Sequence, residues 1–178
     1  MPHIELDPRL PGIRALFAYR PETAQPLGLL AETLLRGPSS LSVGERELIA
    51  SVVSKGNDCT FCSSSHGAAA AAALGEDLEV VAATWHDLDR APVSAKVKAL
   101  LRVALAVRES GKAVTPELVE AARAEGATDV EIHDTVLIAA AFCMYNRYVD
   151  GLATVAPPEL SAYRGMGERL VEQGYLRL

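Results

Sequence analysis

The sequence predicts an all-α protein, and three observations support this fold class. Apolar residues recur at helical spacing and not in the alternation typical of strands. Capping residues and Gly or Pro breakers divide the chain into roughly eight segments of helical length. The chain has 178 residues, 49% of them hydrophobic and 22% charged, which suits a compact unit with a buried core. We therefore expect a multi-helix bundle of roughly eight helices that forms a single domain over residues 1–178.

The first predicted helices follow a lead-in that is punctuated by prolines. A short helix is expected at residues 9–18, and Leu residues at helical spacing predict another at residues 26–35, which ends at Gly37. Ser42 then begins the next helix, because Glu45 three residues later completes a capping box.

A turn at residues 56–58 precedes the next helix, which is expected to run through Leu74. Asn57 or Asp58 can cap its first turn. Six consecutive alanines at residues 68–73 favour a helix and allow neighbouring backbones to approach closely. We interpret these alanines as tight internal packing.

The second half of the chain contains the remaining predicted helices. Thr115 is an expected N-cap before Pro116, and Thr128 with Glu131 forms a second capping box. The predicted segments are a short helix at 77–84, a polar connection at 85–92, helices at 94–110 and 116–126, a long apolar helix from 129 to about 152, and a final helix around 159–173.

Charge and composition exclude several classes of partner. The net charge is −6 and the basic residues are scattered, so no basic stripe is available for a nucleic acid. Residues 1–10 lack the features of a signal peptide, and no apolar run reaches membrane-spanning length. Three cysteines are too few for a disulfide scaffold, which points to a reducing compartment. We expect a cytoplasmic protein without a nucleic-acid or membrane partner.

One constellation carries most of the chemical information. Cys59, Cys62 and His66 form a C-x-x-C-x-x-x-H pattern, and Glu47 lies twelve positions before the first cysteine. On a helix the three positions of the pattern fall within about 60° of one another, so two thiols and an imidazole share one face. This set provides an attacking sulfur, a resolving sulfur and a proton carrier for reversible thiol chemistry. Placement in the first turns of a helix predicts lowered pKa values for the thiols.

A metal site is the competing interpretation of the same residues. Cys59, Cys62, His66 and Glu47 would give four zinc ligands, but structural zinc sites usually place paired cysteines on a turn, and the chain has no second C-x-x-C. Glu47 alone would be interpreted as a solvated surface residue, and its spacing to the cysteines favours a place in the site instead. We therefore expect neither a metal nor an organic cofactor.

Other polar and sulfur-bearing residues are assigned no catalytic role. Cys143 follows an apolar run and is expected to be a small buried hydrophobe. Asn146, Arg147 and Asp150 are expected to cap the long helix or to form an internal ion pair. The histidines left outside the site are His3, His86 and His133.

The stretch from Glu47 to His66 resembles the E-x11-C-x-x-C-x-x-x-H signature of AhpD-like alkylhydroperoxidases in the carboxymuconolactone decarboxylase superfamily. Residues 127–132, followed by Phe142, Asn146-Arg147 and Asp150-Gly151, look like the uncharacterised peroxidase-related branch of that superfamily. The likeness extends over about residues 26–151, and only the Glu, Cys, Cys and His set is specific.

This resemblance implies an all-α AhpD-like fold, assembly into homo-oligomers and a peroxide-reducing thiol site. By analogy, Cys62 attacks the hydroperoxide, Cys59 closes the disulfide, and Glu47 and His66 relay protons. An external thiol or dithiol then restores the reduced state. Characterised AhpD enzymes carry a second His where this chain has Phe61, so one candidate proton carrier is missing.

Two further functions stay open at this point. One is a thiol-disulfide oxidoreductase that acts on a protein or a lipoyl group. The other is a non-catalytic module that senses redox state or binds zinc. Lactone decarboxylation is disfavoured, because decarboxylase members of the superfamily typically lack the Cys pair.

Overall fold

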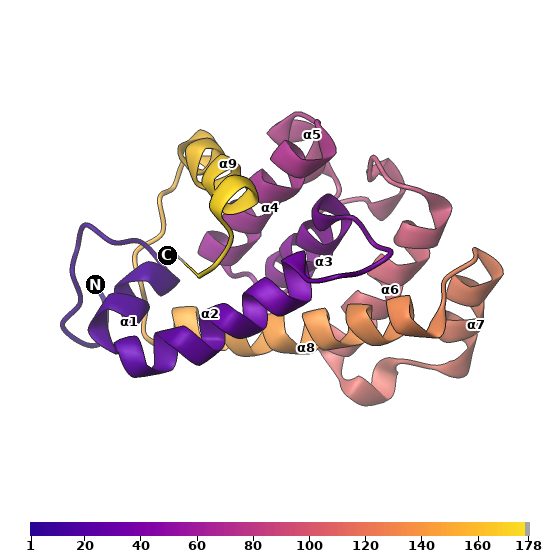
Figure 1. Cartoon of the computed structure of the whole chain (residues 1–178), viewed down its shortest axis with the longest axis horizontal. Coiled ribbons are helices and arrows are strands. Elements are labelled where there is room, and N and C mark those ends of the chain that lie inside the picture. The colour runs from indigo at the N-terminus through magenta and orange to yellow at the C-terminus, as the bar shows by residue number, and fades with distance from the viewer. Residues whose placement is uncertain (177–178) are drawn as a thin grey trace.

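The computed structural model describes residues 1–176, and within this range the chain forms helices joined by turns and loops, with no strand (Figure 1). This confirms the all-α fold class. The α-helices are α1 (Ile13–Tyr19), α2 (Pro21–Arg36), α3 (Val43–Gly56), α4 (Thr60–Leu74), α5 (Leu78–Ala83), α6 (Ala95–Glu109), α7 (Pro116–Ala124), α8 (Asp129–Gly151) and α9 (Arg164–Gln173). Short 3-10 helices are η1 (Leu88–Arg90), η2 (Gly111–Ala113) and η3 (Leu160–Tyr163).

Helix starts agree with the capping signals in the sequence. Ser42 and Glu45 form the predicted capping box of α3, and Thr128 and Glu131 form that of α8. Thr115 caps α7 through the amide of the third helical residue. These starts are predictable because each depends on residues within one turn.

Several boundaries differ from the prediction, since α1 begins at Ile13 and not at residue 9, and α9 begins at Arg164 and not at residue 159. Helix α2 begins at Pro21 and not at residue 26, so Pro26 lies inside it. Pro21 occupies the first helical position, where a missing amide hydrogen is harmless. The polar connection at 85–92 contains η1, which begins where the Asp87 side chain accepts a hydrogen bond from the Asp89 amide.

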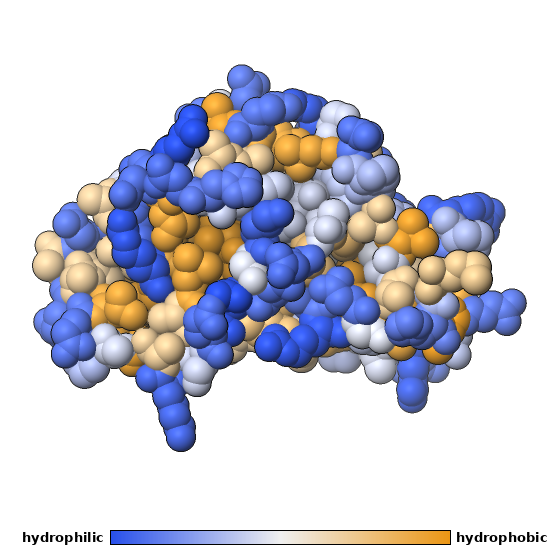
Figure 2. Space-filling model, turned by 180° about the vertical axis from the view of Figure 1, so that it is seen from behind, coloured by the Kyte–Doolittle hydropathy of each residue, from blue (hydrophilic) through white to orange (hydrophobic). Residues whose placement is uncertain are grey.

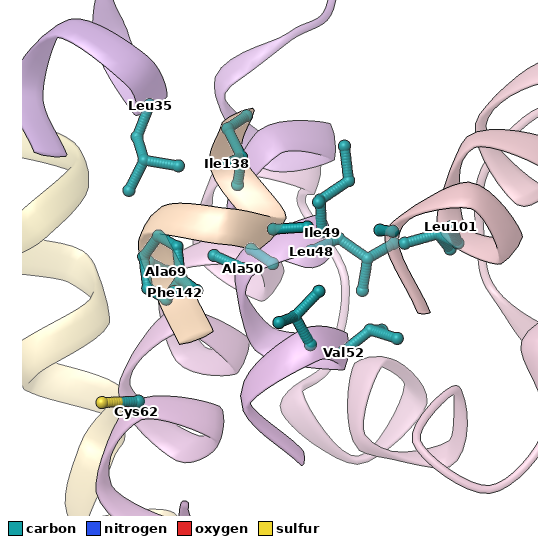
Figure 3. Packing of buried hydrophobic residues seen from close by; sticks show 14 of the residues in the cluster. Leu35, Leu48, Ile49, Ala50, Val52, Cys62, Ala69, Leu101, Ile138 and Phe142 are labelled. Carbon is teal, nitrogen blue, oxygen red and sulfur yellow. The ribbon is translucent and has the colours of Figure 1, made fainter. Parts of the chain in front are cut away.

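Helices α3 and α4 form the centre of the bundle and pack against each other along their length. Helix α8 packs against α3 and α6, while α9 lies beside α4 (Figure 1). Leu48, Ile49, Ile138 and Phe142 are among the buried side chains that meet there. Figure 3 shows this cluster, with Cys62 at its edge.

The alanine run of α4 lies where this helix meets α9. Ala68 to Ala71 are buried, and a Cβ atom on Gly167 of α9 would overlap the backbone of Ala68. Small residues on both helices therefore permit the close approach. This confirms tight packing as the role of the buried part of the run.

The face opposite to that of Figure 1 is mainly hydrophilic, with hydrophobic residues gathered in patches between polar ones (Figure 2). Helix α8 exposes Val130, Leu137 and Met144, which are seven residues apart. A spacing of seven keeps side chains within about 20° of one helix face. Among residues 1–176, no helix is both long and apolar enough to cross a membrane.

Candidate active site

Glu47 is a buried residue of α3 and not a surface residue. Its exposed fraction is 1%, although Glu45 on the same helix is partly exposed. The side chain points toward α4, where Oε2 lies 2.7 Å from Nδ1 of His66. The spacing in the sequence thus identified a real contact between two helices.

Cys59, Cys62 and His66 come together at the start of α4, as predicted. Cys59 is the N-cap residue, and Cys62 and His66 lie in the first two turns. All three are buried, with exposed fractions of 0%, 3% and 9%. The prediction that Asn57 or Asp58 caps α4 is wrong, because both residues belong to the preceding turn.

That turn is held by polar contacts to α3 and α8. The Asn57 side-chain amide donates to Oδ1 of Asn146 at 2.9 Å, and the Asn146 amide donates to the Ser54 hydroxyl at 2.9 Å. Asp58 has a φ of 59°, and the Cys59 amide donates to the Ser54 carbonyl at 3.0 Å. These bonds fix where α4 begins and so place the first sulfur.

The contact between Glu47 and His66 defines the tautomer of the imidazole. An ionised carboxylate can only accept hydrogen bonds, so Nδ1 of His66 carries a proton when it faces Oε2 of Glu47. In the neutral ring, Nε2 is then the nitrogen that can take up a further proton. The pair has the arrangement of a base held in place by a carboxylate.

Cys59 contradicts the expectation of a lowered thiol pKa. Hydrogen bonding to Cys62 and burial raise the pKa of Cys59. The helix N-terminus does not overcome these effects, because the charged form of Cys59 would be desolvated beside another sulfur. Cys59 therefore keeps its proton, and Cys62 is the sulfur that lines a pocket.

The pocket beside Cys62 is mostly apolar. Cys62 and His66 line it together with side chains from α1, α2, α8 and α9, and it encloses about 50 Å³. This space accommodates a few atoms, such as the reactive end of a substrate. The residues that give it its character are Ile13, Arg14, Phe17, Leu27, Phe142 and Met166.

Tyr175 is a site residue that the sequence analysis missed. Its hydroxyl donates to Oε1 of Glu47 at 2.5 Å and lies 3.2 Å from Nδ1 of His66. Burial, followed by the charge of Glu47, raises the pKa of Tyr175 well above 10. No local pattern marks this residue, because it lies 128 positions from Glu47 in the sequence.

Phe61 occupies the position where the resemblance leads one to expect a second His. Its ring is 4% exposed and packs edge-on against Tyr163, with centroids 6.1 Å apart. Gly12, whose φ is +57°, lies so close to the ring that a Cβ atom would overlap it. Phe61 thus anchors the lead-in of the chain against α4 and supplies no proton carrier.

The other polar and sulfur-bearing residues considered in the sequence analysis lie outside the pocket. Cys143 is partly exposed, whereas the sequence analysis expected a buried residue. Its sulfur lies 3.5 Å from the side-chain amide nitrogen of Asn57. Asn146 is buried in the polar network described above, so it does not cap α8. Arg147 is exposed and donates to the Cys143 carbonyl at 2.9 Å. Burial raises the pKa of Asp150, against the lowering effect of its hydrogen bond with Cys59.

The remaining histidines lie outside the site. His133 is exposed on α8 and lies 3.0 Å from the Asp134 carboxylate, while His86 is exposed in the connection after α5. Within the described part of the chain, no three His, Cys, Asp or Glu side chains are arranged to hold a metal ion. Both oxygens of Glu47 are already engaged, one by His66 and one by Tyr175.

A buried dithiol beside a carboxylate-bound imidazole, at the centre of an all-α bundle, defines the class of protein as an all-helical protein with a buried Cys-Cys-His-Glu constellation. Comparison with known sequences agrees, since the profile of the Carboxymuconolactone decarboxylase family matches residues 21–106. The sequence and the fold are therefore similar to those of the AhpD-like/carboxymuconolactone decarboxylase superfamily. No curated protein matches the sequence.

Two solved structures are similar over most of their length. One is the alkylhydroperoxidase AhpD core of an uncharacterised peroxidase-related protein from Ralstonia eutropha, with 26% identity and a TM-score of 0.78, covering 89% of this chain and 82% of the other. The second is an uncharacterised peroxidase-related protein from a Silicibacter species, with 27% identity and a TM-score of 0.75, covering 86% and 78%.

Proposed function

We propose that this protein is a thiol-dependent peroxidase that reduces hydroperoxides through a dithiol-disulfide cycle of Cys59 and Cys62. The observation that carries the proposal is that Cys62 and His66 line one pocket while Glu47 holds the far nitrogen of the imidazole. A nucleophile and a base thus line the same pocket, and a carboxylate orients the base.

The reaction balances with the groups at the site. His66 takes the proton of Cys62, and the thiolate attacks the terminal oxygen of the hydroperoxide. The O–O bond breaks, the leaving alkoxide receives the proton from His66, and Cys62 becomes a sulfenic acid. Cys59 then attacks the oxidised sulfur, its proton leaves with the hydroxyl group as water, and a disulfide forms. An external thiol or dithiol supplies two electrons and two protons to restore both thiols.

The burial and the raised pKa of Cys59 support this order of events. Cys59 has a raised pKa and is fully buried, which suits a resolving thiol that reacts only after its neighbour is oxidised. The apolar lining of the pocket favours an organic hydroperoxide, since an alkyl group can replace water there.

The proposal is tested by peroxide consumption with dithiothreitol or dihydrolipoamide as reductant. Cys62→Ser is expected to abolish turnover, whereas Cys59→Ser leaves Cys62 able to react but prone to overoxidation, which mass spectrometry detects. Cys143→Ser is the matched control and is expected to keep full activity, because Cys143 lies outside the pocket. Full activity of Cys62→Ser would contradict the proposal.

The alternative functions predict other results. A thiol-disulfide oxidoreductase would reduce protein or lipoyl disulfides rapidly and show no burst of disulfide formation with micromolar peroxide. Burial of both sulfurs disfavours a protein partner, since a large disulfide substrate needs an exposed attacking thiol. A redox sensor would consume peroxide only stoichiometrically, and a zinc-binding module would retain metal on purification.

We also propose that the protein acts in the cytoplasm as a homo-oligomer. The apolar stripe of α8, formed by Val130, Leu137 and Met144, supports a contact between subunits because these side chains are exposed on one face. Size-exclusion chromatography with light scattering measures the assembly directly.

A further inference from the structure

The segment after α9 crosses the site and is fixed there by its backbone. Gly174 has a φ of +72°, a conformation that favours glycine, and a Cβ atom on it would overlap the Glu32 carboxylate of α2. The amide of the following residue, Tyr175, donates to Oε2 of Glu32 at 2.7 Å. Arg36 adds a hydrogen bond to the Leu170 carbonyl at 3.0 Å and an ion pair with Glu32. These contacts aim the Tyr175 side chain inward.

The tyrosine ring then completes the surroundings of Glu47 and His66. Its exposed fraction is 5%, and its plane lies within 13° of the imidazole plane at a centroid distance of 5.9 Å. The hydroxyl bonds to Oε1 of Glu47, and His66 takes Oε2, so each carboxylate oxygen has one donor. A buried carboxylate stays ionised only when such donors replace the lost water.

We propose that Tyr175 is a positioning residue of the proton relay: its hydroxyl holds the Glu47 carboxylate, which in turn holds His66 in the tautomer that can take the thiol proton of Cys62. This role rests on the proposed function of the site and adds a residue to it. The phenol is suited to the task, because it retains its own proton and donates it to Oε1 of Glu47. Together with Glu47 and His66, Tyr175 gives the site a third hydrogen-bonding side chain, which Phe61 cannot provide.

A purely structural role is separated from this one by removing only the hydroxyl. Tyr175→Phe keeps the stacked ring but leaves Oε1 of Glu47 without its donor, so the carboxylate loses one of the two hydrogen bonds that hold it. His66 is then held less firmly by Glu47 and takes the thiol proton of Cys62 less readily. We expect the midpoint of the pH profile of Cys62 alkylation to rise by about one unit. The rate of Cys62 alkylation at pH 7 is then expected to fall roughly 10-fold.

The measurement is the rate of Cys62 alkylation by iodoacetamide as a function of pH, assigned to individual cysteines by mass spectrometry. Tyr148→Phe is the matched control, because Tyr148 is a partly buried tyrosine of α8 that does not line the pocket and does not bond to Glu47. The control is expected to leave the pH profile unchanged. Thermal melting of both variants verifies that each is folded.

A double-mutant cycle tests whether the effect passes through the carboxylate. In a Glu47→Gln background, Tyr175→Phe is expected to cause no further shift of the profile. An unchanged profile for Tyr175→Phe alone, or an undiminished shift in the Glu47→Gln background, would overturn the proposal.

Because alkylation needs no peroxide, the two proposals fail separately. A shifted profile in a protein that does not turn over peroxide would support the positioning role and remove the peroxidase function. Peroxide turnover that depends on Cys62, together with an unshifted alkylation profile, would support the peroxidase function and remove the positioning role of Tyr175.

Discussion

Asn146 shows how one buried side chain maintains the turn before the cysteine pair. It accepts a hydrogen bond from Asn57 and donates one to Ser54, and its exposed fraction is 1%. An apolar replacement would leave two polar groups in α3 and the turn without a partner. Removing the partner of a buried polar group lowers the free energy of unfolding more than removing a solvent-exposed hydrogen bond does.

We therefore predict that Asn146→Leu lowers the free energy of unfolding by about 1–3 kcal/mol. Urea denaturation followed by circular dichroism measures the change. Arg147→Ala is the adjacent control, because this exposed side chain bonds only to a carbonyl of its own helix, and a change below about 0.5 kcal/mol is expected. Equal losses for the two variants would contradict the role assigned to the network.

At the scale of residues, the sequence predicted four side chains that the structure places around the candidate site, and it did not predict the contact of Tyr175 with two of them. Glu47, Cys59, Cys62 and His66 could be found because a helix converts spacing into a shared face, and the family signature fixes the spacing. Tyr175 could not be found, since its approach depends on how α9 and the following turn pack against α2. The thiol pKa was predicted in the wrong direction for Cys59, because its contact with Cys62 and its burial are tertiary effects.

At the scale of elements, the capping box of α8 carries a buried charge. Glu131 is 1% exposed and accepts hydrogen bonds from Lys96 at 2.7 Å, from Ser40 at 2.9 Å and from the Thr128 amide at 2.8 Å. Burial alone would raise the pKa of Glu131, but the bonds from Lys96, Thr128 and Ser40 lower it from 4.5 to about 2. The carboxylate therefore links α8 to α6 and to the loop before α3.

This lowered pKa predicts a loss of stability in acid. Its contribution is complete above the unfolded value of 4.5 and disappears as the pH falls toward about 2. The expected loss is up to about 3 kcal/mol, since each unit corresponds to about 1.4 kcal/mol. Denaturant titrations at several pH values measure it.

Glu131→Gln is expected to be less stable at pH 7 and to depend less on pH between about 5 and 2. Glu125→Gln, at an exposed carboxyl without an ion pair in the described part of the chain, serves as the control. If Glu131→Gln kept the slope of the parent protein in this range, the assignment would be wrong.

Most elements could be predicted because their signals are local. Ser42 with Glu45, Thr128 with Glu131, and Thr115 before Pro116 mark starts within one turn of the chain. The start of α2 could not be predicted from the local sequence, because Pro21 and Pro26 both fit the first position of a helix. Only tertiary packing favours the longer helix that begins at Pro21.

At the scale of the whole molecule, α9 packs on α4 and forms part of the wall of the pocket. The helix rests on α4 through Gly167, where a methyl group would overlap the backbone of Ala68. Backbone atoms cannot rotate away, so the two helices would have to separate. The sequence predicted both helices but contained no local sign that they touch.

We predict that Gly167→Ala destabilises the protein by about 1–3 kcal/mol through overpacking. Gly165→Ala is the control on the same helix, because nothing lies within 4 Å of the added methyl group and alanine favours helix formation. Thermal melting is therefore expected to move in opposite directions for the two variants. Similar melting temperatures would contradict the close contact between α4 and α9.

The hydrogen bond between Tyr175 and Glu47 spans 128 positions of the chain. A ribosome releases the N-terminal residues first, so the acid and the imidazole emerge long before the phenol that holds them. A nascent chain accordingly carries its two sulfurs without a finished relay. Reactivity of the sulfurs toward oxidants then becomes coupled to the synthesis of the segment after α9, which can settle on the bundle only once it has left the ribosome.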